Sequence, residues 1–413
     1  MSTSGAVMMH DLARQFVKQG HQATVVIPFA GLNCAIDLQH QAGCKVVYVR
    51  VLPTKDVNHI LRAWAEWLNP YLIWFRLRRY TPFTLNPFDG VVWYSPSIFW
   101  APLIKRVRQF FQCPSYLILR DMFPDWALDL EILKPGLQYR LLKWVQESQY
   151  AQADTIGVQS PNNLSAFIVQ NPGLKNRSEV LWNWGSPEMD PPQLERQAHQ
   201  VQQVQQAKEA HPACSIDLSK SSLSGRTLFV YAGNMGLAQD VDVLVDLANA
   251  LNQRTDIGFI LVGRGSEVPR LRARITNEQL SNIQIYDEIA ADEIKGLYAQ
   301  CHVGIVSLDL RHTTHNIPGK LVSYMQAGIP VLAIVNPGND LLALIRTHQL
   351  GVACDTHALQ EICAGVDKLV SLCKTPAAIQ QRCQAFFAHY FSVETAAKQI
   401  LRQLQNTKDE HLR

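Results

Sequence analysis

Short apolar runs alternate with longer stretches of helical period along most of this chain. They form two series, one before residue 185 and one after residue 225. The expected strands are 22–29, 44–51, 90–96, 115–121, 155–160 and 178–184, then 227–233, 257–263, 283–287, 302–308, 330–335 and 351–355. Strands that alternate with helices are typical of parallel sheets covered by helices on both faces. The pattern therefore predicts an α/β protein with two doubly wound, Rossmann-like domains.

The segment between the two series has a different composition. Residues 185–225 include the stretch QVQQVQQAKEA and few strong apolar residues, which predicts a linker or insertion with one polar helix. Near the other end, Ser392 is a good N-cap for a helical pattern that follows it. The predicted organisation is an N-terminal domain over 1–184, the linker, a C-terminal domain over 226–390 and a terminal helix over 391–413.

Composition narrows the class of protein. The chain has 413 residues, of which 47% are hydrophobic and 18% charged, as in ordinary globular proteins. Its net charge of +3 is too small to indicate a nucleic-acid partner. The nine cysteines occur singly and never as CxxC, so neither a zinc site nor a disulfide framework is indicated. With no secretory signal in MSTSGAVMMHDLARQF and no apolar run of spanning length, we expect a cytoplasmic protein.

Two expected strand-to-helix turns of the second series are rich in glycine. One is Gly233-Asn234-Met235-Gly236, and the other is Gly263-Arg264-Gly265. Such turns let backbone N–H groups approach an anion at the start of a helix, which predicts a phosphate-binding loop. The alternative is a tight turn that simply needs glycine.

A lysine follows a helix-start signal in IPGKLVSYM. Pro318 and Gly319 mark the start, which places Lys320 in the first turn of the helix. A cation there suits a diphosphate leaving group, whose charge it offsets without a metal. Arg264 is a candidate second cation. The alternative is that Lys320 is a solvated surface residue.

The segments VYAGNMG, VGRG and IPGKLxSYMxAGxPVLA resemble the donor half of a family-4 glycosyltransferase of the GT-B type. Within that family they are most similar to the WbuB-like group, linked to transfer of an N-acetyl-L-fucosamine-type sugar. The resemblance implies two Rossmann-like domains facing across a cleft and a terminal helix that crosses back to the first domain. It implies a nucleotide-sugar donor, expected to be UDP-linked, and a lipid-linked saccharide acceptor. Transfer with retained anomeric configuration and no metal cofactor are expected.

One family hallmark is missing. The family carries two glutamates with seven residues between them, and the matching positions here are His315 and Ser323. Ser323 is a candidate hydrogen-bond partner for a ribose hydroxyl, more weakly than a carboxylate. His315 is a candidate to face the reacting sugar, or is only a polar loop residue.

In the first domain, LILRDMFP resembles the family segment written RDLWP. Asp121 follows Arg120 at the end of an expected strand, where open α/β sheets bind ligands, and could orient a sugar hydroxyl. The alternative is a purely structural Arg–Asp pair. Gly5 marks the loop at the first helix, where the backbone could approach donor or acceptor. Asn183 resembles the asparagine at the family's hinge, and we expect it to be structural.

The strand that family members place before the first helix is absent from the sequence. Its loss would leave both neighbouring strands exposed in the middle of the sheet. Two explanations are open: the true start codon lies upstream, which we favour, or the amino-terminal sheet is altered.

Residues 60–80 combine interfacial aromatics with arginines. The stretch contains Trp64, Trp67 and Trp74, which prefer a bilayer interface, and it also contains Arg76, Arg78 and Arg79. This composition predicts peripheral contact with the inner face of the cell membrane. The alternative is a Rossmann crossover whose aromatics pack in the core.

Two other functions fit the same fold. One is a nucleotide-sugar epimerase, which needs acid and base side chains in its cleft and no acceptor. The other is a non-catalytic relative that acts as a binding partner, an interpretation favoured by the missing glutamates.

Overall fold

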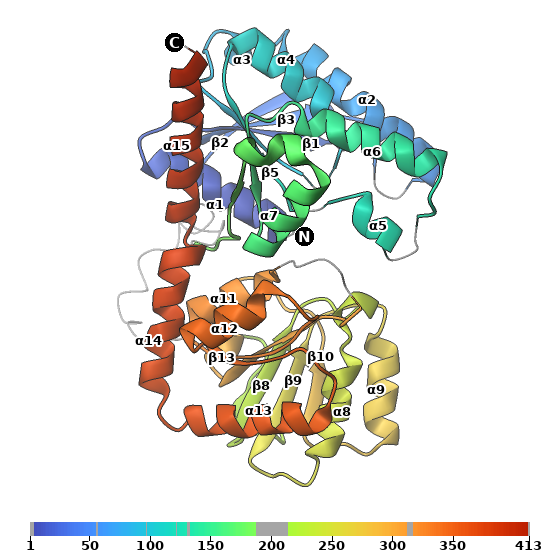
Figure 1. Cartoon of the computed structure of the whole chain (residues 1–413), viewed down its shortest axis with the longest axis vertical. Coiled ribbons are helices and arrows are strands. Elements are labelled where there is room, and N and C mark those ends of the chain that lie inside the picture. The colour runs from blue at the N-terminus through green and yellow to red at the C-terminus, as the bar shows by residue number, and fades with distance from the viewer. Residues whose placement is uncertain are drawn as a thin grey trace. The chain divides into compact units, whose positions relative to one another are not determined.

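The computed structural model describes residues 4–54, 57–95, 97–120, 122–129, 133–186, 214–311 and 317–411. The chain divides into two compact units. Met1–Trp182 and Val393–Arg413 form the first unit, and Asn183–Ser392 form the second (Figure 1). The helix expected in the Gln-rich stretch lies outside the described residues.

The second unit is built on one six-stranded parallel sheet. Its strand order is β10-β9-β8-β11-β12-β13. The strands are β8 (Thr227–Ala232), β9 (Ile257–Val262), β10 (Ile283–Tyr286), β11 (Val303–Ser307), β12 (Val331–Ile334) and β13 (Gly351–Cys354). Each corresponds to a strand predicted from the second apolar series. All six residues of β9 are buried, as expected of a central parallel strand covered on both faces.

Helices cover both faces of this sheet. They are α8 (Asp242–Ala250), α9 (Val268–Asn277), α10 (Ile294–Tyr298), α11 (Gly319–Ala327), α12 (Asp340–His348), α13 (Leu359–Leu372) and α14 (Pro376–Phe386). One core cluster joins Leu244 and Leu247 of α8 with Phe229 and Phe259 of the sheet. A parallel sheet of this kind brings the carboxyl ends of its strands, and the loops that follow them, to one edge.

In the first unit, the strands form two separate sheets. One has the order β1-β3-β2 and the other the order β4-β5-β6-β7. The strands are β1 (Thr24–Phe29), β2 (Ile36–Gln41), β3 (Cys44–Arg50), β4 (Val91–Tyr94), β5 (Ser115–Ile118), β6 (Thr155–Val158) and β7 (Ser178–Val180). All pair in parallel except β2, which is antiparallel to β3.

The strand β2 was not predicted. It is joined to β3 by Ala42 and Gly43, whose φ angles of 49° and 81° fit the two-residue hairpin turn that matches strand twist. Its sequence, IDLQHQ, alternates apolar and polar residues, but it is short and mostly polar. The sequence feature that could have predicted this hairpin is therefore the Ala-Gly pair just before the strongly apolar β3.

Each of the two sheets of the first unit has an edge strand that is poorly buried, β1 in one sheet and β4 in the other. The residues of β1 are half-buried or exposed, whereas every residue of β5 and β6 is buried. Only Trp93 of β4 is buried. Val26 of β1 and Val91 of β4 nevertheless pack against the same cluster as Val49 and Ile73. Within the described residues, the sheet of the first unit is thus divided between β1 and β4.

The helices of the first unit include the last helix of the chain. They are α1 (Ser4–Lys18), α2 (His59–Leu77), α3 (Thr81–Thr84), α4 (Ala101–Phe111), α5 (Asp125–Asp129), α6 (Leu137–Tyr150), α7 (Pro161–Gln170) and α15 (Val393–His411). The helix α15 packs against α1 and β5. Gln399 Nε2 donates to the carbonyl of Val180 at 2.8 Å, which fixes α15 beside β7. No helix in the described parts of the chain is long and apolar enough to cross a membrane.

Candidate functional site

The start of α11 presents an open helix N-terminus. Pro318 is its N-cap, with extended backbone angles, and Gly328 with a φ of 76° ends the helix. Among the described residues, and apart from its chain neighbours and its own helix, no atom lies within 4 Å of the point where a Cβ on Gly319 would stand. Unsatisfied N–H groups and the helix dipole favour an anion at such a position.

Lys320, in this first turn, lies over the ring of Tyr231. Its Nζ is 3.6 Å from the ring centroid, and a Cβ on Gly233 would be only 3.7 Å from that Nζ. The side chain is half-buried, and desolvation lowers the pKa of Lys320 to about 7. The structure therefore places an amine, desolvated and poised between charge states at neutral pH, beside the glycine loop. This arrangement differs from the solvated surface lysine of the alternative interpretation.

Tyr231 is a residue that the sequence did not reveal as part of the site. It is the next-to-last residue of β8, and its hydroxyl donates to the carbonyl of Asn234 at 2.5 Å. That bond holds the loop after β8 against the ring over which Lys320 lies. An aromatic at the end of a buried strand is ordinarily a core residue, so no sequence signal distinguished it.

The two glycine loops pack directly on each other. A Cβ on Gly263 would lie 1.9 Å from the carbonyl oxygen of Gly233, and one on Gly265 would lie 2.1 Å from that of Met235. Met235 N–H donates to the carbonyl of Arg264 at 2.8 Å. Both Gly263 and Gly265 are thus required for the close approach of the two loops. This is a structural reason for glycine at these positions, as in the alternative of a tight turn.

Three N–H groups of the first loop already have acceptors. Gly233 donates to the carbonyl of Val262 at 2.9 Å, Met235 donates as described, and Gly236 donates to Gln239 Oε1 at 3.1 Å. The side chain of Asn234 also donates to Gln239, at 2.8 Å. The predicted cradle therefore does not have these three groups as free donors. What the loop provides is its shape and its position beside Lys320.

The remaining predicted residues of the second unit differ in position. Ser323 is half-buried on α11, one turn beyond Lys320 and on the same side of the helix. The guanidinium of Arg264 is 61% exposed and pairs with Glu288 at 3.3 Å, at the rim of the loops. His315 lies outside the described residues, so its prediction stays untested by the structure.

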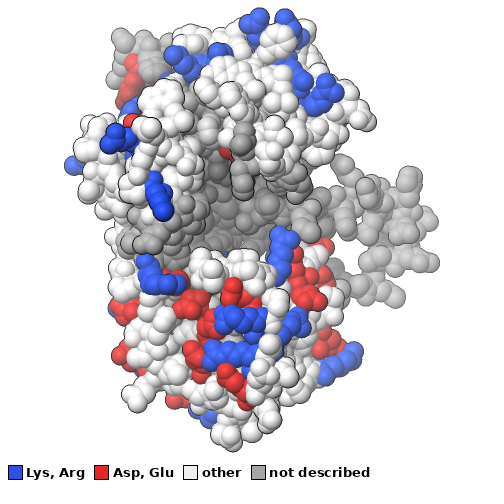
Figure 2. All heavy atoms as spheres, turned by 90° about the vertical axis from the view of Figure 1, so that its right-hand side faces the viewer, with Lys and Arg blue, Asp and Glu red and all other residues white. Residues whose placement is uncertain are grey.

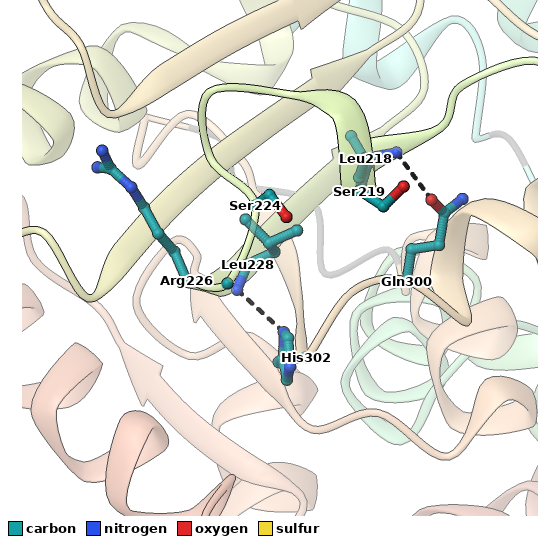
Figure 3. Close-up of a pocket in the computed structure, with 8 residues that line it drawn as sticks. Leu218, Ser219, Ser224, Arg226, Leu228, Gln300 and His302 are labelled. Atoms are coloured by element: carbon teal, nitrogen blue, oxygen red, sulfur yellow. Dashed lines mark hydrogen bonds between the residues drawn. The ribbon is translucent and has the colours of Figure 1, made fainter.

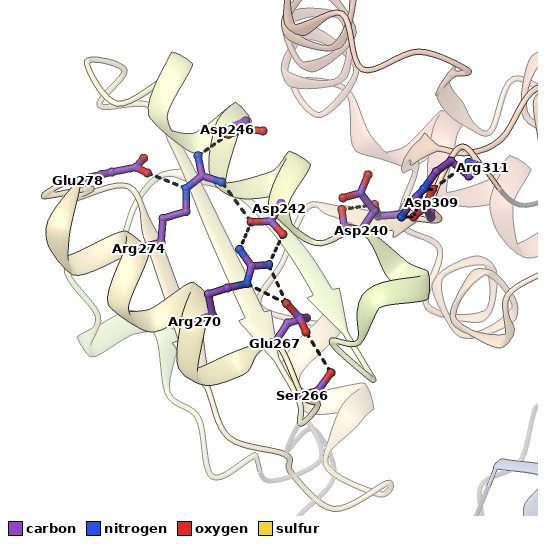
Figure 4. Close-up of polar contacts among 11 residues, drawn as sticks. Asp240, Asp242, Asp246, Ser266, Glu267, Arg270, Arg274, Glu278, Asp309 and Arg311 are labelled. Atoms are coloured by element: carbon purple, nitrogen blue, oxygen red, sulfur yellow. Dashed lines mark hydrogen bonds and ion pairs between the residues drawn. The ribbon is translucent and has the colours of Figure 1, made fainter. Parts of the chain in front are cut away.

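Two pairs of charged side chains that the sequence did not single out lie at the same edge of the sheet. His357 Nε2 lies 2.9 Å from Asp240 Oδ2, and Arg311 pairs with Asp309 at 2.5 Å. Burial raises the pKa of Asp240. Figure 4 shows Asp240, Asp309 and Arg311 together beyond the strand ends. Within the described residues, no group of three or more His, Cys, Asp or Glu side chains could hold a metal ion.

Figure 4 also shows an ion-pair network that joins α8 to α9. Arg270 pairs with Asp242 and Glu267, and Arg274 pairs with Asp242 and Asp246. The arginine partners lower the pKa of Asp242. Because Glu267 directly follows the second glycine loop, this network steadies the loop from outside the site.

Asn183 anchors the segment that leads into α11. It is buried, and its Nδ2 donates to the carbonyl of Ile317 at 3.0 Å. Nearby, Gln326 Nε2 donates to the carbonyl of Ser186 at 2.6 Å. Asn183 is therefore structural, as expected, and it also fixes the residue just before Pro318.

The predicted residues of the first unit are only partly described. Arg120 is buried and donates to the main-chain carbonyls of Trp182 at 3.1 Å and Leu119 at 3.3 Å, so it has a structural role. Asp121 lies outside the described residues. Gly5 stands against Tyr94 of β4, whose ring carbon would be 3.1 Å from an added Cβ.

A hollow of about 270 Å³ lies at the opposite edge of the second sheet (Figure 3). Leu228, at the start of β8, donates its N–H to His302 Nδ1 at 3.0 Å. Burial lowers the pKa of His302. Because His302 Nδ1 accepts this bond, it is not available to a ligand in the hollow.

Comparison with known proteins places these features in a family context. Residues 226–371 match the family model described as "Glycosyl transferases group 1". The matched segment contains both glycine loops, Tyr231 and α11. Among curated proteins, the chain is 23% identical over 300 residues to "Probable glycosyltransferase WbjE" of Pseudomonas aeruginosa, which covers 71% of this chain and 69% of that protein.

Solved structures share the fold over nearly the whole chain. HepE of Anabaena, in complex with UDP and glucose, superposes with a TM-score of 0.62 at 16% identity, over 98% of this chain and 96% of that one. WaaG, described as a glycosyltransferase involved in lipopolysaccharide biosynthesis, gives a TM-score of 0.61 at 12% identity, over 96% of each chain. The predicted α/β fold of the GT-B class is confirmed. The matches support the resemblance to group 1 glycosyltransferases and do not distinguish the WbuB-like subgroup.

Proposed function

We propose that this chain is a glycosyltransferase that takes its sugar from a UDP-linked donor held by the second unit. The observation that carries the proposal is the position of Lys320, in the first turn of α11 and over Tyr231. Supporting it, these residues lie in the segment that matches group 1 glycosyltransferases, and HepE, which shares the fold, was solved with UDP and glucose.

The chemistry follows from charge. As the glycosidic bond breaks, negative charge grows on the diphosphate, and a preorganised cation and helix N-terminus stabilise it most at that moment. Lys320 would hold the diphosphate, and Ser323 would hydrogen-bond the ribose. Arg264 would reach the diphosphate from the rim if it leaves Glu288.

The proposal extends to stereochemistry. A leaving phosphate oxygen can accept the proton of the acceptor hydroxyl on the same face of the sugar, which gives retention without a dedicated protein base or a metal. Asp121 and His315 would then orient hydroxyl groups. This part rests on the motif resemblance.

The finer identity of the substrates is part of the same proposal. The WbuB-like motifs favour an N-acetylated deoxyhexosamine as the sugar. WaaG, which shares the fold and is involved in lipopolysaccharide biosynthesis, favours a saccharide acceptor for surface polysaccharide synthesis. We propose a lipid-linked acceptor reached from the cytoplasmic face of the membrane.

The two rival functions make different demands. An epimerase needs no acceptor and releases a new UDP-sugar. A non-catalytic relative binds UDP or a partner and turns nothing over. The desolvated Lys320 favours the transferase, because a cation held against a leaving diphosphate serves bond cleavage.

A turnover assay separates the three. The full chain is incubated with a set of UDP-sugars, with and without lipid-linked saccharides, and UDP and sugar products are measured. We expect UDP release that rises when an acceptor is present. Formation of a new UDP-sugar without acceptor would establish the epimerase, and binding of UDP without any turnover would establish the non-catalytic relative.

A further inference from the structure

The outward face of α2 is apolar, which is unusual for a surface helix. Ala65, Asn69, Ile73 and Leu77 form its buried side. The residues that recur every three or four positions on the outer side are Leu61, Trp64, Leu68, Tyr71 and Phe75, and each is between 39% and 57% exposed. A helix packed on a sheet normally turns charged residues to water. Here the water-facing side is itself a second hydrophobic stripe.

Trp67 extends this stripe. Its ring stacks on that of Trp64, with centroids 6.2 Å apart, and it is 52% exposed. Two of the aromatic and basic residues that the sequence singled out are half-buried. Trp74 packs edge-on against Phe110 at 5.7 Å and against a core cluster, and Arg76 donates to the carbonyl of Arg50. The predicted membrane contact through 60–80 stays a prediction, in which these two residues are less exposed than Trp64 and Trp67.

A second exposed stripe lies on α6. Leu137, Leu141 and Trp144 share one side of this helix and are 85%, 60% and 62% exposed. The helix α4 packs against both α2 and α6, so the three helices belong to one layer of the first unit (Figure 1). Exposed apolar patches of this size on a soluble unit mark an interaction site.

The charge around these stripes is positive on balance. The helices α2, α4 and α6 carry seven Lys or Arg residues and two Glu residues, although Arg108 and Lys143 pair with Asp154 and Asp125 from outside these helices. Glu66 pairs with Arg62 at 2.9 Å. Figure 2 shows one face of the first unit, where blue residues stand among white ones and red is scarce.

The arginines are placed over the exposed rings. The guanidinium carbon of Arg79 is 3.6 Å from the centroid of Phe75, and that of Arg106 is 4.8 Å from the centroid of Tyr71. This arrangement lets an aromatic body enter an apolar phase while its cation stays at the surface. Tryptophan, tyrosine and arginine in this combination are typical of a membrane–water interface.

We infer that the outer faces of α2 and α6 form one docking surface for an anionic lipid bilayer. Leu61, Trp64, Trp67, Phe75, Leu141 and Trp144 insert among the headgroups, and Arg78, Arg79 and Arg106 contact lipid phosphate. The purpose of this surface, to bring the first unit to a lipid-linked acceptor, rests on the proposed function. The surface itself is inferred only from the exposure and the charge of its residues.

Vesicle sedimentation of the full chain tests the inference. The probes are phosphatidylcholine vesicles and vesicles of phosphatidylcholine mixed with phosphatidylglycerol. We expect pelleting with the anionic vesicles that weakens as salt rises, because charge is screened within about 10 Å at 0.1 M. The variant Trp64→Ala/Trp67→Ala/Trp144→Ala should have an affinity for these vesicles that is lower by roughly tenfold or more. Interfacial affinity scales with buried apolar area, which this variant reduces.

Matched controls keep the outcomes separable. Val169→Ala removes an exposed apolar side chain from α7, outside the surface, and should pellet as the wild type does. Arg78→Gln/Arg79→Gln leaves the apolar stripes intact, so it tests the surface if the tryptophan variant does not fold. We expect it to lose only the salt-dependent part of binding. Unchanged UDP affinity in every variant shows that the second unit is intact, so a failure of docking does not count against the proposed donor site.

Two results would overturn the inference. One is equal pelleting of the wild type and both surface variants on anionic vesicles. The other is a wild-type dimer in sedimentation velocity that the tryptophan variant converts to a monomer, with no vesicle binding. That second result would make the surface an interface between two copies of the chain.

Discussion

The ammonium nitrogen of Lys320 lies 3.6 Å from the centre of the Tyr231 ring. In the sequence, the strands β9, β10 and β11 lie between these two residues. Tyr231 is the next-to-last residue of β8 and Lys320 is the second residue of α11, so the contact joins the end region of a strand to the first turn of a helix at one edge of the sheet. The ring excludes water from one side of the amine. Burial lowers the pKa of Lys320 to about 7, although the ring contact itself favours the charged form.

Replacement of Lys320 by alanine should impair turnover. Loss of a charge-assisted contact to a leaving diphosphate costs about 2–4 kcal/mol of transition-state stabilisation, which is a fall of roughly 30-fold or more in kcat/KM. The measurement is UDP release from the best donor. Lys368→Ala, on the exposed side of α13, is the control and should match the wild type. Activity of Lys320→Ala within about threefold of the wild type would show that Lys320 does not stabilise the leaving diphosphate.

The lowered pKa predicts a pH dependence of UDP binding. Below a pKa of about 7 the amine of Lys320 is already charged, and above it the free protein holds the amine neutral. A bound diphosphate favours the charged form and raises the pKa, so binding above pH 7 takes up a proton. UDP affinity should therefore fall as pH rises above about 7.

Calorimetry in buffers of different ionisation enthalpy measures this proton directly. We expect uptake by the wild type at pH 8 and none by Lys320→Arg, because arginine stays charged throughout. Proton uptake that is the same in both proteins would assign the proton to another group.

Alanine at Gly263 should destabilise the second unit. The added Cβ would meet the carbonyl oxygen of Gly233 at 1.9 Å, and the φ of 148° is itself unfavourable for a side chain. Strain of this kind costs on the order of 2 kcal/mol or more. The measurement is chemical denaturation, with Gly173→Ala as the control because no atom lies within 4 Å of its added Cβ. Equal stability of the two variants would mean that the glycine loops can separate without cost.

The alternation of apolar runs predicted the strands of the second sheet because the central strands are buried on both faces and read as unbroken hydrophobic segments, while the edge strands β10 and β13 are partly buried. The same rule failed for β2, an edge strand whose outward residues are polar. It also could not show that β1 and β4 belong to separate sheets, because pairing depends on which strands meet in space.

The candidate site was predicted unevenly for a similar reason. Lys320 and the glycines carry local signals, a helix start and turn residues, that can be seen in the sequence. Tyr231 carries none, since only the fold brings its ring under Lys320. The glycines were interpreted as phosphate contacts, whereas Gly263 and Gly265 serve the packing of one loop on the other. Trp74 and Arg76 could not be told from Trp67 and Arg79 until the buried side of α2 was known.

Titration of UDP into the full chain by calorimetry, with EDTA present, tests whether α11 and Lys320 hold the diphosphate without a metal. We expect UDP to bind without a divalent metal, since α11 and Lys320 supply the positive field. We also expect Lys320→Ala to weaken this binding and Lys368→Ala to leave it unchanged. Absence of UDP binding in EDTA with recovery on adding Mg²⁺, or equal affinity in the Lys320→Ala protein, would contradict this expectation.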